Sequence, residues 1–144
     1  MKTHLSLATQ NLNESVAFYS TLLNSKPAKH YDDYALFLTE SPGLELALTL
    51  NPRARISSDA HYGLAVDTPD LVDSAIERLK GAGIAVDIET EETCCYAKQN
   101  KVWATDPDGR RWETYYVIAE TDEGESEDMS CCRDTGNETT CCSA

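Results

Sequence analysis

The sequence predicts an α+β fold built from two copies of a βαβββ module, which together form a curved mixed sheet shaped like a cup. Three observations support this. The run His4-Leu5-Ser6-Leu7-Ala8 is matched later by His61-Tyr62-Gly63-Leu64-Ala65. An amphipathic stretch follows each run, and strand-like segments follow each amphipathic stretch. At 144 residues the chain is long enough to bury a substantial core.

Both helices have recognisable start signals. The first is predicted to begin at Asn11 as N-cap, with Glu14 three residues on as a capping-box partner. The second is predicted to begin at Thr68, because Pro69 suits the first helical position, and to stop at Gly81.

The remaining strands follow the helices. The turn sequence Asp106-Pro107-Asp108-Gly109 predicts a hairpin between the last two of them. The predicted strands cover residues 34–39, 44–50, 85–89, 101–105 and 111–118.

Composition divides the chain at about residue 118. We expect one domain over residues 1–118, with modules at about 1–55 and 58–118. Residues 119–144 contain eight acidic residues and one arginine, with almost no large apolar side chains. Such a segment buries too little surface to offset its ordering entropy, so we expect an acidic, cysteine-rich, disordered tail.

Charge and hydropathy limit the partners. The net charge of −13 argues against binding to nucleic acid or to an anionic membrane. No apolar run is long enough to span a bilayer, and the N-terminus lacks the apolar stretch of a signal peptide. We therefore expect a cytoplasmic protein whose cysteines are reduced.

Two histidines and a glutamate form a candidate metal site. His4 and His61 hold matching positions in the two repeats, and small residues share their strand faces. Glu113 lies in the last predicted strand and converges with them if the two halves face each other. Two imidazoles and one carboxylate are the donor set of non-haem Fe(II) oxygenases, which leaves positions open for substrate and O2. The same donors also accept Ni, Co, Mn or Zn.

All six cysteines occur as adjacent doublets, and none has C-x-x-C spacing. Adjacent thiols can close two bonds onto one soft centre, such as trivalent arsenic carrying one organic group. We interpret Cys94 and Cys95 as a clamp for such a substrate. The tail doublets are either accessory metalloid-capture sites or passive; they are Cys131, Cys132, Cys141 and Cys142.

Two runs resemble a known family. Val102-Trp103-Ala104-Thr105-Asp106-Pro107-Asp108-Gly109-Arg110-Arg111-Trp112-Glu113 resembles the C-terminal signature of the vicinal oxygen chelate superfamily, and Glu14-Ser15-Val16-Ala17-Phe18-Tyr19 resembles its first-helix signature. The resemblance covers residues 1–118 and implies that His4, His61 and Glu113 are the metal ligands. The Cys94-Cys95 doublet and the cysteine-rich tail are similar to the C–As lyase branch. Cadmium-induced relatives share much of the pattern.

This resemblance implies a non-haem iron, dioxygenase-type C–As lyase that uses Fe(II) and O2. It would convert methylarsenite or aromatic arsenicals to arsenite in detoxification, with His4, His61 and Glu113 as catalytic residues. One alternative is a thiol-based arsenic- or cadmium-binding protein without turnover. Another is a different enzyme of the superfamily: a thiol transferase, a glyoxalase or an extradiol dioxygenase.

Glu45 separates these alternatives. A glyoxalase would need a fourth protein ligand in the first half, and Glu45 is the nearest candidate. Measured against the run from Gly109 to Glu113, it falls two residues short relative to Gly43, so we do not expect it to bind the metal. The sequence leaves open whether the halves meet within one chain or across a domain-swapped homodimer.

Overall fold

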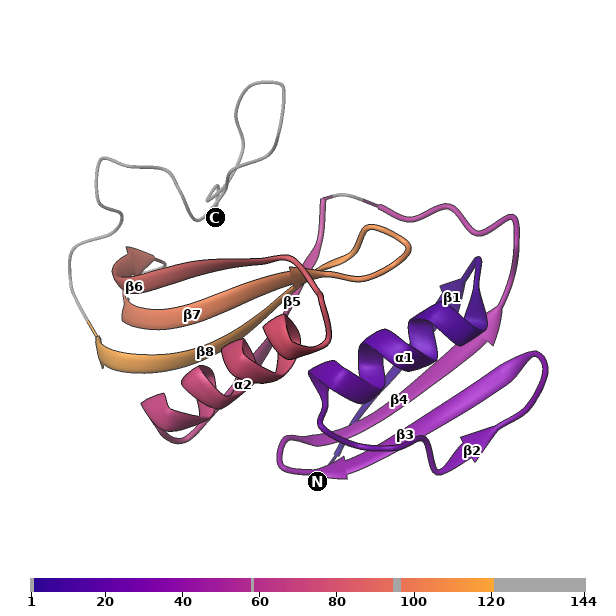
Figure 1. The fold of residues 1–144 in the computed structure, drawn as a ribbon, viewed down its shortest axis with the longest axis horizontal. Helices are drawn as coiled ribbons and strands as arrows, with labels where there is room; N and C mark the ends of the chain where they lie inside the picture. The colour runs from indigo at the N-terminus through magenta and orange to yellow at the C-terminus, as the bar shows by residue number, and fades with distance from the viewer. Residues whose placement is uncertain (1, 58, 95–96, 121–144) are drawn as a thin grey trace.

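The computed structural model describes residues 2–57, 59–94 and 97–120, and only the backbone of residues 92–94. The first half contains β1 (Thr3–Thr9), α1 (Leu12–Leu22), β2 (Lys29–His30), β3 (Tyr34–Glu40) and β4 (Gly43–Leu50). The second contains β5 (His61–Ala65), α2 (Pro69–Gly81), β6 (Val86–Cys94), β7 (Ala97–Thr105) and β8 (Arg111–Glu120). The predicted pair of βαβββ modules is confirmed (Figure 1).

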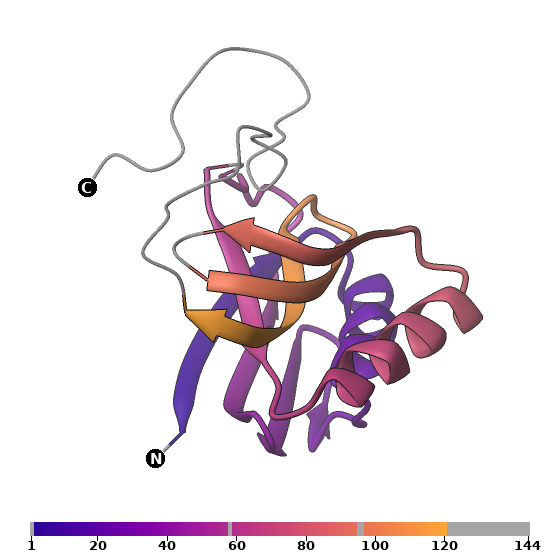
Figure 2. The ribbon, with the colours of Figure 1, turned by 90° about the vertical axis from the view of Figure 1, so that its left-hand side faces the viewer.

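Each half forms its own four-stranded mixed sheet. The strand orders are β1-β4-β3-β2 and β5-β8-β7-β6. The pairs β1–β4 and β5–β8 are parallel, and the other neighbours are antiparallel. Both helices lie on one side of the molecule and the strands on the other, as Figure 2 shows. One face of each sheet is therefore packed against a helix, and the opposite face carries none.

The helix-covered faces share one apolar core. Alternate leucines of β4 point into it, and Leu46 and Leu48 are fully buried. The ring of Tyr19 from α1 contacts Phe37 of the first sheet and Trp112 of the second, with ring centroids 6.5 and 5.6 Å away. Each large apolar side chain buried in this way contributes about 1.5–3 kcal/mol, and here the burial also joins the two halves.

The turn between β7 and β8 connects the halves through buried polar contacts. The Tyr19 hydroxyl donates a hydrogen bond to Asp106 Oδ2 at 2.7 Å, and the Arg110 guanidinium contacts the same oxygen at 3.1 Å. Arg110 also donates to the carbonyl of Ala8 at the end of β1. Burial first, and then the negative charge of Asp106, raise the pKa of the Tyr19 phenol, so its hydroxyl remains a donor. We call Tyr19, Asp106 and Arg110 the inter-half latch.

Some elements differ from the prediction. The two-residue strand β2 was not predicted, β6 and β7 extend further toward their shared hairpin, and β8 continues to Glu120. The tail from residue 121 onward lies outside the described residues. Within the described part of the chain, no helix has the length and hydrophobicity needed to cross a membrane.

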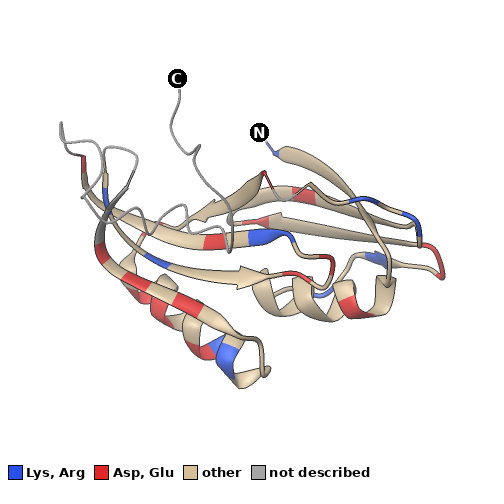
Figure 3. Ribbon diagram, turned by 90° about the horizontal axis from the view of Figure 1, so that it is seen from above, with Lys and Arg blue, Asp and Glu red and all other residues tan. Residues whose placement is uncertain are grey.

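Acidic residues are concentrated on α2 and on β6, as the red segments of the ribbon in Figure 3 show. On β6 they include Asp87, Glu89 and Glu91, and this strand forms one edge of the second sheet. Charged side chains on an edge strand discourage pairing with a further strand. The β6 edge is therefore a poor surface for sheet extension.

Candidate metal centre

The second half brings two of the expected metal ligands together. Gly63 of β5 lies opposite Glu113 of β8 in a parallel register, and His61 is two residues before Gly63. His61 Nε2 lies 3.6 Å from Glu113 Oε1. The imidazole is 57% exposed, whereas the carboxylate is only 11% exposed. A nitrogen donor and an oxygen donor thus face one another at the edge of a partly buried site.

Gly63 makes this approach possible. A Cβ atom at this position would lie 2.9 Å from Tyr115 Cε1 and 3.1 Å from Glu113 Oε1. Any larger residue would push the tyrosine ring or the carboxylate away from β5. The small residue noted beside His61 in the sequence therefore provides space for Glu113.

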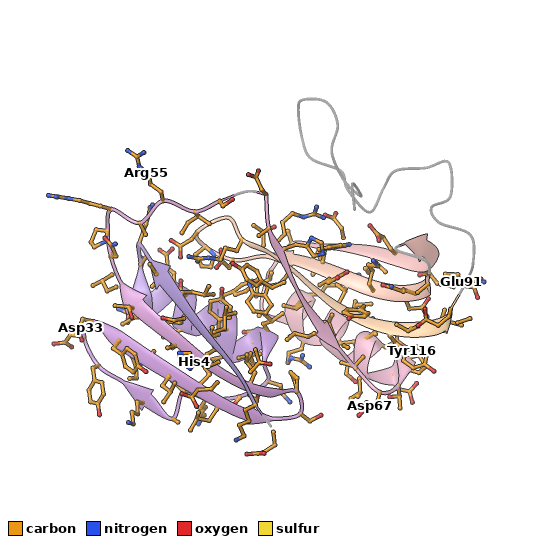
Figure 4. The ribbon with its side chains drawn as sticks, turned by 180° about the vertical axis from the view of Figure 1, so that it is seen from behind. His4, Asp33, Arg55, Asp67, Glu91 and Tyr116 are labelled. Atoms are coloured by element: carbon orange, nitrogen blue, oxygen red, sulfur yellow. The ribbon has the colours of Figure 1, made fainter. Side chains whose placement is uncertain are left out.

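The first half holds a second histidine–glutamate pair. His4 of β1 lies directly opposite Glu45 of β4, and His4 Nδ1 is 3.2 Å from Glu45 Oε1. Both side chains are exposed on the sheet face without a helix, where Figure 4 shows His4. Glu45 lies opposite His4 itself, whereas Glu113 lies opposite Gly63, two residues after His61. The two-residue offset expected for Glu45 is therefore present. Glu45 nevertheless reaches the histidine.

The two pairs remain separate within one chain. Among the described residues, no three His, Cys, Asp or Glu side chains gather closely enough to hold a metal ion. The structure thus unites His61 with Glu113 and leaves His4 with Glu45. Each pair still fits a divalent cation chemically, because it offers one imidazole nitrogen and one carboxylate oxygen. In addition, Glu113 Oε2 is buried without a hydrogen bond from the described residues, although the ammonium of Lys101 forms an ion pair with it.

A cluster of charged and aromatic side chains surrounds Glu113. Trp103 lies opposite it on β7, and the guanidinium of Arg111 lies 4.3 Å from the indole centroid. The ring of His61 packs edge-on against the same indole at 5.3 Å. Lys101, two residues before Trp103 and on the same strand face, places its ammonium 3.3 Å from Glu113 Oε2. Lys101 is not one of the metal ligands predicted from the sequence. Strand alternation with Trp103 is the signal that places it beside Glu113.

The backbone of Cys94, the first residue of the expected thiol clamp, lies at the far end of the second sheet. Cys94 is the last residue of β6 and pairs with Ala97, whereas Trp103 lies opposite Glu113. Six residues of strand separate Ala97 from Trp103, a distance of about 20 Å. Glu91, near this hairpin, lies at the end of the molecule remote from the first half (Figure 4). Cys95 and the tail cysteines Cys131, Cys132, Cys141 and Cys142 lie outside the described residues.

Paired βαβββ halves, each with a histidine on its first strand and a glutamate on the neighbouring parallel strand, define the class of this protein. Residues 3–114 match the Glyoxalase/Bleomycin resistance protein/Dioxygenase superfamily, and the chain belongs to that family. The resemblance to the vicinal oxygen chelate superfamily is thereby confirmed.

Two named relatives are similar to this chain over most of its length. The chain is 38% identical over 143 residues to a protein of Bacillus sp. (strain MD1) named trivalent organoarsenical cleaving enzyme, covering 97% of this chain and 89% of the relative. It is 39% identical over 121 residues to the cadmium-induced protein CadI of Mycobacterium tuberculosis, covering 84% of this chain and 79% of the relative.

A solved structure supports the fold. A glyoxalase/bleomycin resistance protein/dioxygenase from Alicyclobacillus acidocaldarius superimposes with a TM-score of 0.68 at 23% identity, covering 83% of this chain and 92% of that one. At this identity the likeness concerns the fold alone.

Proposed function

We propose that this protein cleaves the carbon–arsenic bond of trivalent organoarsenicals, such as methylarsenite or aromatic arsenicals, in a reaction that needs Fe(II) and O2 and yields arsenite together with the organic group, which O2 oxidises. The observation that carries the proposal is the vicinal pair Cys94-Cys95, whose first residue ends a strand of the sheet that also bears His61 and Glu113. Identity over almost the whole chain to a protein named trivalent organoarsenical cleaving enzyme adds support.

In this proposal, His4, His61 and Glu113 hold the metal. Iron(II), when bound there, supplies the activation of dioxygen that cleavage of the carbon–arsenic bond requires. The exposures of the three side chains suit this role. The carboxylate of Glu113 is largely buried, whereas the imidazoles of His4 and His61 are exposed, so small molecules can reach the metal from their side. Glu45, beside His4, is a further carboxylate within reach of the same site.

We extend the proposal to a homodimer. Since one chain keeps the two histidine–glutamate pairs apart, the triad is completed when the first half of one copy faces the second half of another. Two features support this arrangement. The sheet faces that bear the pairs are not covered by helices, and the inter-half latch fixes the two halves of one chain in their side-by-side positions.

The cysteines would bind the substrate. Cys94 and Cys95 take up R–As(III) as a dithiolate and orient its organic group. Because the hairpin is about 20 Å along the strand from the Glu113 level, it has to bend toward the metal. Backbone irregularities favour bending here. The β6–β7 register shifts between Glu89 and Glu92, the β7–β8 register shifts at Lys98, and Glu91 has a φ of 56°.

The decisive experiment follows arsenic speciation after reduced, Fe(II)-loaded protein is mixed with methylarsenite in air. We expect catalytic release of arsenite that stops without oxygen. Cys94→Ser and Cys95→Ser should abolish turnover while keeping iron, whereas His61→Ala should lose both. His30→Ala is the matched control, because this exposed histidine of β2 lies outside the site, and it should behave as wild type.

The competing function is sequestration of arsenic or cadmium through thiols, and the observation that favours it is the arrangement of all six cysteines as adjacent doublets. Sequestration predicts stoichiometric binding of arsenic or cadmium that survives the removal of iron and oxygen, with no release of arsenite. Turnover that persists in Cys94→Ser would reject the clamp. Normal iron use by His61→Ala would reject the metal assignment.

A further inference from the structure

A buried lysine faces the candidate metal carboxylate. The side chain of Lys101 is 2% exposed, and its ammonium lies 3.3 Å from Glu113 Oε2 and 4.0 Å from Glu89 Oε2. It also lies 5.5 Å from the ring centroid of Trp103. A buried ammonium is costly unless it is paired, and the two carboxylates supply that pairing. Yet a positive charge beside a cation site opposes metal binding, so its presence there needs a reason.

The geometry of Glu113 provides a reason for the positive charge of Lys101 beside the candidate metal centre. Its two carboxylate oxygens have different neighbours, because Oε1 faces His61 at 3.6 Å and Oε2 faces Lys101 at 3.3 Å. A carboxylate with both oxygens available can bind a cation through both. When an ammonium attracts Oε2, only Oε1 is presented on the side of the histidine.

We propose that Lys101 is a positioning residue that keeps Glu113 a single-oxygen metal ligand and thereby leaves a coordination position open for a small exogenous ligand. Glu89 shares the ammonium from the other side and limits its competition with the metal. The inference rests on the proposed metal centre and deepens it. It concerns how many positions the protein fills, a property that a list of ligands does not determine.

The test uses Co(II), whose visible absorption reports its coordination, in the reduced full-length protein. Two quantities are measured: the affinity for Co(II), and the affinity of the Co(II)-loaded protein for pyridine, which is uncharged at neutral pH and so is insensitive to the loss of a nearby charge. For Lys101→Met we expect Co(II) to bind about tenfold more tightly, because an opposing charge is gone and Glu113 can chelate through both oxygens. We expect pyridine to bind about tenfold more weakly, because the second oxygen occupies its position.

Opposite changes in these two affinities distinguish positioning from packing. Lys101→Gln, which keeps a polar group in the buried space, should shift both in the same directions and serves if Lys101→Met does not fold. Lys98→Met is the matched control. Lys98 lies on the same strand and pairs with Glu91 at 2.9 Å, away from Glu113, so neither affinity should change.

Each other result overturns the inference. A joint fall of both affinities means that Lys101 only packs, and tighter Co(II) binding with unchanged pyridine binding means that only its charge acts. No change in either affinity means that Lys101 has no role at the metal. If wild-type protein shows no Co(II) binding that His61→Ala abolishes, the proposed metal centre fails and this inference fails with it.

Discussion

At the scale of single residues, the candidate metal centre depends on Gly63, which has no side chain. The strand position of Gly63, opposite Glu113, leaves no room for a Cβ between the carboxylate and the ring of Tyr115. In the sequence, small residues share the strand faces of both histidines. The structure gives the space at Gly63 a more specific use, because it is filled by Glu113 itself.

Gly63→Ala should therefore weaken metal binding more than folding. The added methyl group displaces the Glu113 carboxylate from His61, and we expect about a tenfold loss in Fe(II) or Co(II) affinity by titration. The free energy of unfolding should change by no more than about 1–2 kcal/mol, since a tighter contact is offset by a stiffer unfolded chain. Gly81→Ala is the control, because nothing lies within 4 Å of its added Cβ. Equal metal affinities in the two variants would contradict this account.

At the scale of elements, both helices begin where local sequence predicts, but their caps differ. Asn11 Oδ1 accepts a hydrogen bond from the backbone N–H of Glu14 at 3.2 Å, as a capping residue should. Thr68 occupies the equivalent position before Pro69 in an extended conformation, yet its side chain makes no capping hydrogen bond within the described residues. The second helix starts through the fixed φ of its proline instead.

This difference predicts unequal costs for the same substitution. Asn11→Ala should lower the free energy of unfolding by about 1 kcal/mol, because one backbone N–H loses its partner. Thr68→Ala should lower the free energy of unfolding by only a few tenths of that amount, since no capping hydrogen bond is lost. Chemical denaturation of the two variants in parallel measures both values. A Thr68→Ala variant as unstable as Asn11→Ala would show that the threonine hydroxyl caps α2 in solution.

Strand lengths and pairings were harder to predict than helices. The part of β6 and β7 near their hairpin is polar, as Glu91 and Lys98 illustrate, so it lacks the alternation of a half-buried strand. The predicted strand stops at residue 89, whereas β6 continues to Cys94. The contact of Glu45 with His4 comes from the parallel register of β1 with β4. That register joins distant segments and leaves no local signal in the sequence.

At the scale of the whole molecule, the repeat in sequence predicted two equivalent halves but not their mutual placement. The latch sets that placement. Tyr19 of the first half donates to Asp106 of the second, and Trp112 in turn donates to the Tyr19 hydroxyl at 3.2 Å. These buried bonds would have to break before the two sheet faces of one chain could turn toward each other. One chain therefore keeps the pair His4–Glu45 apart from the pair His61–Glu113.

If a second copy completes each centre, two inactive variants should rescue one another. His4→Ala removes the imidazole from the first-half pair, and His61→Ala removes it from the second-half pair. In a mixed dimer, the intact first half of one chain meets the intact second half of the other at one of the two centres, while the remaining centre lacks both histidines. Co(II) or Fe(II) binding, and turnover if the proposed function holds, should therefore reappear when the variants are unfolded and refolded together.

The yield of this rescue has a defined ceiling. Random pairing makes half of the dimers mixed, and each mixed dimer carries one intact centre, so binding should reach about a quarter of the wild-type stoichiometry. Refolding each variant alone supplies the control and should restore nothing. A mixture that binds no more metal than the separate variants, although both have refolded and dimerised, would place all three ligands of each centre within one chain and reject the shared site.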